Sequence, residues 1–381
     1  MTASPDSAPA ALPLARPVIG DREQELVADV LSSGQLSLGP MLDRFERDFA
    51  SWVGAGDAVA VSSGTAALHL GVRSLGWGAG DEVITSPLSF VASANCLLYE
   101  DVTPVFCDVD PTSANLDPQA AAAAVGERTA GILPIDIFGH PCAMPELEGV
   151  GARHGLGLLR DSCEALGARD ADGTRVGARG ELATFAFYAN KQLATGEGGM
   201  VIPRDAAEAA RLRSERNQGR APDMGWLTHD RLGFNYRLSD VASAIGVAQL
   251  ERLDDMLAAR AGLAALYGRR LGDLDGLEIP HPPPSPAEHG WFVYVVRLPS
   301  GVGRDAVIDG LAAEGIASKE YLPCIHLYPH YRERFGFTGG EFPVAEDISA
   351  RSLALPFAIG MGEDDVDRVA TALGRIAGLP G

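Results

Sequence analysis

The amino-acid sequence predicts an α/β fold, with a large domain around a mostly parallel sheet and a smaller α+β domain at the C-terminal end. Between about residues 57 and 203, short apolar and β-branched runs alternate with helical patterns, as in parallel sheets covered by helices on both faces. After about residue 238 this alternation gives way to longer helical patterns and a proline-rich break. The chain of 381 residues also exceeds the size that one hydrophobic core usually supports.

The strands of the large domain are expected where apolar runs end in polar or glycine-rich turns. In chain order they are DAVAVSS (57–63), DEVITSP (81–87), TPVFCDVD (103–110), TAGILPIDIFG (129–139), GLGLLRD (155–161), ELATFAFY (181–188) and GGMVIP (198–203). Helices are expected between them, over GTAALHLGVRSLG (64–76), FVASANCLLYE (90–100), an alanine-rich stretch from Pro118 and MPELEGVGARHG (144–155).

The C-terminal part begins with an amphipathic pattern that predicts one long helical region over 238–274. A proline-rich break (279–290), a strand WFVYVVRLP (291–299) and two helices, over 305–315 and 364–378, are expected to follow. These patterns predict a disordered tail over 1–12, a large domain over 13–250 and a small domain over 251–381.

Composition limits the classes of function. Lys plus Arg number 31 against 51 Asp plus Glu, a formal charge of -20, which disfavours binding to nucleic acid or to an anionic membrane. No apolar run has the length of a transmembrane helix, and the N-terminus lacks the basic start of a signal peptide. The five cysteines are odd in number and show no C-x-x-C spacing. This usage predicts reduced thiols in a cytoplasmic protein.

The basic residues contain one useful irregularity. Lys191 and Lys319 are the only lysines of the chain, and the other basic residues are all arginines. Arg stays protonated in proteins, whereas a desolvated Lys can become a neutral nucleophile. From the count alone, the presence of two lysines by chance is as good an explanation as a chemical role for one of them.

Three groups follow strands of the predicted sheet, where ligands of such sheets bind. Ser63, Gly64 and Thr65 start a helix, and the free N–H groups there make a phosphate cup, although an ordinary helix N-cap explains them as well. Asp161 ends a strand, a weak signal alone. Lys191 lies between an aromatic strand and the GEGG turn, a suitable place for a Schiff base with a carbonyl.

Together these groups match the needs of pyridoxal phosphate. Its phosphate binds helix N–H groups, its ring nitrogen pairs with an acid and its aldehyde condenses with a Lys. Phe90, shortly after the DEVITSP strand, is a candidate to lie against the ring, with core packing as the equal alternative.

Seven motifs, in order over about residues 60 to 330, resemble the DegT/StrS-type sugar aminotransferases, in particular the perosamine synthase-like subgroup. They are VSSGTAALHL, SPLSFVASANCLLYEDVTPVFCDVD, IDIFGHPCAMPEL, RDSCEALGA, FAFYANKQLATGEGGM, LGFNYRLSDVASAIGVAQLERL and YLPCIHLYPHY. The family is a branch of the pyridoxal phosphate enzymes with the aspartate aminotransferase-like fold type I, so the resemblance implies this fold and this cofactor.

The resemblance also implies roles for single residues. Lys191 would bind the cofactor covalently and carry protons, Asp161 would pair with the ring nitrogen, and Gly64 and Thr65, beside Ser63, would hold the phosphate. Phe90 and Glu164 would lie on or near opposite faces of the ring. Asn235 would reach across a homodimer interface to the partner's phosphate, with Arg237 close by, and His326 is a weaker candidate for substrate contact.

Two positions depart from the family pattern. Glu164 lies where other members often carry Gln or His, and its carboxylate changes the charge near the ring. Many members carry a Ser five residues before the Lys as a phosphate ligand, and this chain has Ala186 there.

The expected reaction transfers an amino group from L-glutamate or L-glutamine to a keto group of a nucleotide-linked sugar. The alternatives are a keto-cyclitol aminotransferase, a pyridoxamine-dependent sugar dehydratase (in which His replaces the Lys) and a non-catalytic pyridoxal phosphate-binding regulator. A dinucleotide-binding oxidoreductase is disfavoured, because no G-x-G-x-x-G follows a predicted strand. The arginines of RLRSERNQGR (211–220) are candidates for a substrate diphosphate, with a solvated helix face at least as good an explanation.

Overall fold

The computed structural model describes residues 11–221 and 228–380. Within them, the larger sheet holds seven strands. All neighbouring pairs are parallel except those of β7, which runs against both of its neighbours, so the expected mostly parallel sheet is confirmed. In spatial order the strands are β1 (Val59–Val61), β7 (Gly199–Ile202), β6 (Leu182–Ala186), β5 (Gly157–Asp161), β4 (Thr129–Leu133), β2 (Glu82–Thr85) and β3 (Thr103–Phe106).

Helices cover both faces of this sheet, because the strands are apolar on both sides. One face packs against α3 (Gly64–Ser74), α4 (Ala92–Leu98) and α7 (Ala206–Arg216). The other packs against α2 (Pro40–Val53) and α8 (Asp240–Leu250) at the β1 end, and against α5 (Pro118–Ala123) and α6 (Met144–His154) at the β2 end. Helix α1 (Asp21–Ser33) packs on α8.

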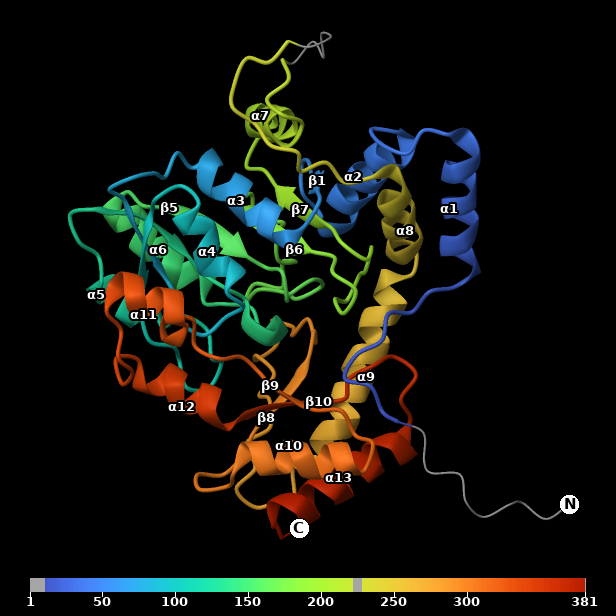
Figure 1. Ribbon diagram of the computed structural model, residues 1–381, viewed down its shortest axis with the longest axis vertical. Coiled ribbons are helices and arrows are strands. Elements are labelled where there is room, and N and C mark those ends of the chain that lie inside the picture. Colours follow the sequence, from blue (N-terminus) through green and yellow to red (C-terminus); the bar gives the residue numbers. More distant parts are fainter. Residues whose placement is uncertain (1–10, 222–227, 381) are drawn as a thin grey trace, which may run out of the picture.

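The C-terminal part has a core of its own around a smaller, antiparallel sheet. In this sheet β10 (Ser352–Leu355) lies between β8 (Tyr294–Arg297) and β9 (Lys319–Glu320). Helix α9 (Leu253–Leu271) connects the large sheet to this part (Figure 1). The other helices here are α10 (Arg304–Ala313), η2 (Ile325–Leu327), α11 (Pro329–Phe335), α12 (Pro343–Arg351) and α13 (Glu363–Ala377).

The single long helix expected over 238–274 is wrong, since α8 ends at Leu250 and α9 begins at Leu253. At the break, the Arg252 guanidinium donates to the backbone oxygen of Val18 at 2.7 Å and pairs with Glu23. The helical pattern continues through this position, so the interruption depends on contacts with a segment more than 200 residues away.

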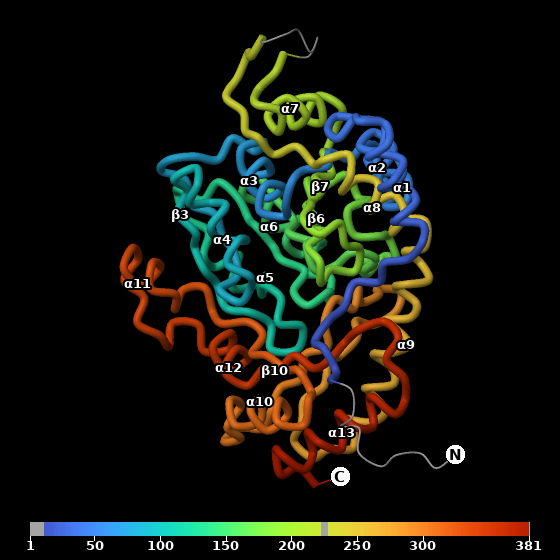
Figure 2. The backbone as a smooth tube through the Cα atoms, turned by 45° about the vertical axis from the view of Figure 1, so that its right-hand side comes forward, coloured from blue at the N-terminus to red at the C-terminus, as the bar shows by residue number. Residues whose placement is uncertain are grey.

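The N-terminal segment runs along the molecule to the C-terminal part (Figure 2). Leu12 pairs with Ile316 and is buried in the C-terminal core. The predicted disordered tail otherwise falls on residues outside the described ranges, and the predicted domain boundaries stay predictions. Among the described residues, no helix has the length and apolarity needed to cross a membrane.

Candidate active site

A cavity of about 470 Å³ lies where β5 and β6 end, beside the start of α3. It brings together the cofactor residues predicted within one chain, namely Ser63, Gly64, Thr65, Phe90, Asp161, Glu164 and Lys191. Ala186, at the position where the resemblance implies a Ser, also lines it. The C-terminal part closes one side with Phe292, Tyr321 and Leu322.

The predicted phosphate cup corresponds to the N-terminus of α3. Ser63 caps the helix, since its Oγ accepts the Ala66 N–H at 3.1 Å. The N–H groups of Gly64 and Thr65 have no acceptor in the described part of the chain, so they are free for an anion. The GEGG turn packs against this start, because a Cβ on Gly199 would lie 2.4 Å from the Ser63 backbone oxygen. The two explanations of this motif therefore both hold, since one residue caps the helix and the next two offer free donors.

Asp161 is buried at the end of β5. One carboxylate oxygen accepts from the Ser93 hydroxyl at 2.7 Å and the other from the Cys163 N–H at 3.1 Å. Burial raises the pKa of this carboxyl, while the two donors and the nearby Lys191 act in the opposite direction. Asp161 is therefore a desolvated acid that gains from a cationic partner in the cavity.

The Lys191 amine lies between a carboxylate and an aromatic ring. Its Nζ is 3.5 Å from Oε1 of Glu164 and 3.9 Å from the centre of the Phe292 ring. Glu164 also accepts the Tyr321 hydroxyl at 3.3 Å and the Phe138 N–H at 2.9 Å. These contacts fix the position of the amine at the cavity wall.

Phe138 belongs to the tight turn η1 (Ile137–Gly139) and has a φ of 60°. A positive φ is costly for a bulky residue. The turn replaces the end of the strand that was expected to continue to residue 139, and it places the Phe138 N–H on Glu164.

Sequence reasoning missed several residues of this site, among them Ser89, Ser93, Phe138, Phe292 and Tyr321. Tyr321 is the first residue of the YLPCIHLYPHY motif, from which only His326 was predicted as a site residue. Ser93 lies three residues after Phe90, at the start of the predicted helix. The available signal was a hydroxyl on a segment that was already expected to lie beside the cofactor.

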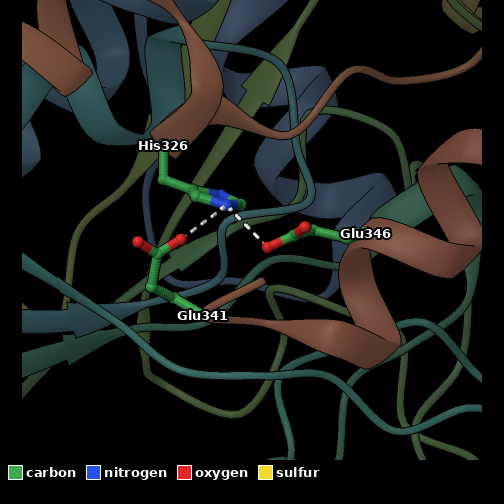
Figure 3. A group of neighbouring side chains, drawn as sticks. All are labelled: His326, Glu341 and Glu346. Carbon is green, nitrogen blue, oxygen red and sulfur yellow. Dashed lines mark hydrogen bonds and ion pairs between the residues drawn. The ribbon is translucent and has the colours of Figure 1, made fainter. Parts of the chain in front are cut away.

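His326 does not reach the cavity, so the expected substrate contact does not follow from the structure. Its side chain is fully buried, and its Nε2 donates to Glu346 at 3.1 Å and lies 4.0 Å from Glu341 (Figure 3). Burial lowers the pKa of the ring. Glu346 already accepts backbone N–H groups from Gly340 and Phe342. Glu346 therefore connects the His326 ring with the loop that precedes α12.

Asn235 and Arg237 also lie outside the cavity lining. Asn235 is exposed, and Arg237 donates to Oδ1 of Asn217 at 2.9 Å. Three arginines of the 211–220 segment are held by carboxylates: Arg211 pairs with Glu215, and Arg213 and Arg216 both pair with Glu46. Their main contacts are therefore internal to the chain.

Comparisons with known proteins identify the family of the chain. The model of the DegT/DnrJ/EryC1/StrS aminotransferase family matches residues 17–374. A GDP-perosamine synthase of Caulobacter vibrioides is 37% identical over 367 residues, which cover 95% of this chain and 97% of the relative. The spore coat polysaccharide biosynthesis protein SpsC of Bacillus subtilis is 37% identical over 375 residues, 95% of this chain and 96% of the relative.

Solved structures give the same result. DesV of S. venezuelae, in complex with a ketimine intermediate, superimposes with a TM-score of 0.90 at 33% identity, covering 97% of this chain and 99% of that one. DesI, solved in the presence of its TDP-sugar product, has a TM-score of 0.86 at 32% identity, covering 96% and 93%. The expected fold type I is thereby confirmed. The chain therefore belongs to the DegT/DnrJ/EryC1/StrS aminotransferase family, and it is an aminotransferase.

Proposed function

We propose that this enzyme binds pyridoxal phosphate and transfers an amino group from L-glutamate or L-glutamine to a keto group of a nucleotide-linked sugar. The observation that carries the proposal is a single cavity with the Lys191 amine, the buried Asp161 carboxylate and the open start of α3. A GDP-perosamine synthase among the relatives, and DesI with its TDP-sugar product among the structures, support the sugar class.

The donor groups of the cavity fit this cofactor. The free N–H groups of Gly64 and Thr65, with the positive end of the α3 dipole, suit its phosphate. Asp161 suits its protonated ring nitrogen, because a desolvated carboxylate gains from a cationic partner. Lys191 supplies the amine for its aldehyde carbon. When bound, the cofactor supplies the electron sink that amino transfer needs.

Lys191 then acts as the base and acid of the reaction. Once the amino group of the donor has replaced it on the cofactor, the free Nζ would remove the proton from the Cα atom of the donor and would donate that proton to the carbon of the cofactor that carried the aldehyde. Glu164 and the Phe292 ring hold the amine in place for both transfers. Tyr321 and Leu322 limit the access of water from the side of the C-terminal part.

The charge of the cavity supports a homodimer. Among the described lining residues Lys191 is the only Lys or Arg, against the carboxylates of Asp161, Glu164 and Glu197. A phosphate, a diphosphate and the carboxylates of glutamate need more positive charge than this. Following the resemblance, we place Asn235 and Arg237 of a second copy at this cavity, where Arg237 would add positive charge. Both residues lie outside the cavity of their own chain, and Asn235 is exposed. The five free cysteines fit a cytoplasmic enzyme.

The first test is spectroscopic. Purified protein with pyridoxal phosphate is expected to show the visible absorbance of the lysine-bound cofactor, and Lys191→Ala is expected to abolish it. Lys319→Ala is the matched control, since Lys319 is exposed on β9, and it should leave the spectrum intact. A wild-type protein that takes up no cofactor contradicts the proposal. Loss of the absorbance in Lys319→Ala would show that the reactive lysine is Lys319 and not Lys191.

The second test concerns the substrate. The enzyme in its pyridoxamine phosphate form is incubated with UDP-, GDP- and dTDP-linked ketosugars and with free inososes. Product formation is followed by mass spectrometry. Turnover of a nucleotide-linked ketosugar is expected. Turnover of inososes alone would replace the proposed substrate with a keto-cyclitol.

A further inference from the structure

Two buried serines form a hydrogen-bonded chain that ends on Asp161. The Ser89 and Ser93 hydroxyls are 2.8 Å apart, and Ser93 Oγ lies 2.7 Å from Oδ2 of Asp161. All three residues line the cavity and are at least 95% buried. Ser93 lies at the start of α4, so the chain connects this helix with the end of β5.

The direction of both bonds follows from the number of protons. An ionised carboxylate only accepts, so the single hydroxyl proton of Ser93 is donated to Asp161. Ser93 has no second proton, and the bond between the serines must therefore be donated by Ser89. Both hydroxyl dipoles point toward the carboxylate, and such chains strengthen one another in a buried site.

We propose that Ser93, supported by Ser89, is a positioning residue that keeps the Asp161 carboxylate ionised and oriented toward the ring nitrogen of the cofactor. The inference rests on the proposed function, because it requires pyridoxal phosphate in this cavity. Sequence reasoning and the resemblance assign no role to either serine.

Other groups also face Asp161, but they do not replace the hydroxyls in keeping its carboxylate ionised. Lys191 favours the ionised acid, yet the proposed function gives its amine to the cofactor. The thiols of Cys96 on α4 and Cys163 after β5 have pKa values raised well above the ordinary one by burial, so they stay neutral at working pH. Once Lys191 is engaged, Ser93 and the Cys163 N–H remain as the donors to the carboxylate.

The test measures cofactor affinity against pH, without reference to turnover. Cofactor-free full-length protein is titrated with pyridoxal phosphate between about pH 4 and 8, a range that includes the ordinary pKa values of Glu and His, and fluorescence gives the Kd. Ser93→Ala is expected to weaken binding at neutral pH about tenfold, as for the loss of a hydrogen bond to a charged group. Because a protonated Asp161 cannot pair with the ring, the loss of affinity on acidification should begin at higher pH in Ser93→Ala.

Three further variants identify the cause. Ser93→Thr keeps the hydroxyl and should show the wild-type dependence of the Kd on pH. Ser89→Ala should shift this dependence in the same direction as Ser93→Ala, by a smaller amount. Ser86→Ala is the matched control, since Ser86 is a buried serine outside the cavity lining whose hydroxyl bonds to the backbone of Leu88, and it should change nothing.

The outcomes separate the two proposals. Wild-type protein without affinity for pyridoxal phosphate overturns the proposed function. Wild-type affinity with an unchanged profile in Ser93→Ala overturns this inference alone. If Ser93→Ala does not fold, Ser89→Ala decides, and an unchanged profile in that variant overturns the inference too.

Discussion

Gly64 lies at the closest approach between the phosphate cup and the sheet. A Cβ at this position would be 2.6 Å from Cβ of Ala186 and 3.3 Å from Sγ of Cys163. Ala186 is fixed on β6 and cannot move aside, so Gly64→Ala must displace the start of α3. We expect the Kd for pyridoxal phosphate to rise by a factor on the order of 10 to 100, as for groups moved by about 1 Å. Fluorescence titration of the folded variant measures this change.

Gly78→Ala is the control for Gly64→Ala, because no atom would lie within 4 Å of its Cβ. This variant should keep the wild-type Kd. An unchanged Kd in Gly64→Ala would mean that the phosphate is bound elsewhere.

Part of the site was predictable residue by residue. Ser63, Asp161 and Lys191 follow separate strands, and the topology of a parallel sheet brings strand ends to one edge. Phe292 and Tyr321 come from another part of the chain, and their position depends on how the C-terminal part docks. No local pattern encodes that docking.

At the scale of elements, buried strands were easier to predict than turns and breaks. The strands of the large sheet lie within the predicted runs, because strands buried on both faces have continuous apolar sequences. The turn at Phe138 and the break before Leu253 were missed. At the first, Phe138 has a positive φ and donates its N–H to Glu164, and at the second, Arg252 contacts Val18. Both contacts join residues far apart in the sequence.

The loop between α11 and α12 gives a pH-dependent prediction. The N–H groups of Thr338 and Gly339 donate to Glu341 at 2.7 Å each and lower the pKa of this carboxyl from 4.5 to about 2. A lowered folded-state pKa stabilises the fold above the ordinary pKa, and this stability is lost as the pH falls from about 4.5 through about 2. Glu341→Gln should therefore lower the Tm at neutral pH. The difference in Tm between this variant and the wild type should become smaller as the pH falls.

Thermal unfolding by circular dichroism at several pH values tests this prediction. Glu333→Gln is the control, since Glu333 is exposed on α11 and accepts no hydrogen bond from the described residues. A Tm difference for Glu341→Gln that is constant with pH would show that the loop does not depend on the charge.

The net charge of -20 has a consequence for the whole molecule. Many arginines are paired with carboxylates of the same chain, including the buried Arg160, which contacts Asp136, Asp170 and Glu181. The cavity lining offers Lys191 as its single Lys or Arg among the described residues. Under the proposed function, an anionic substrate would be held by local N–H groups and by charges from a second chain.

A subunit-mixing experiment tests whether a second chain completes the site. In the proposed dimer each site combines Lys191 of one chain with Asn235 of the other. Lys191→Ala and Asn235→Ala should each be inactive as homodimers, but a mixed dimer has one site with both residues intact. Unfolding and refolding the two variants together at equal concentration should restore about a quarter of the wild-type activity, because random pairing makes half of the dimers mixed. If Asn235 serves the site of its own chain, every site in the mixture lacks one residue and no activity returns.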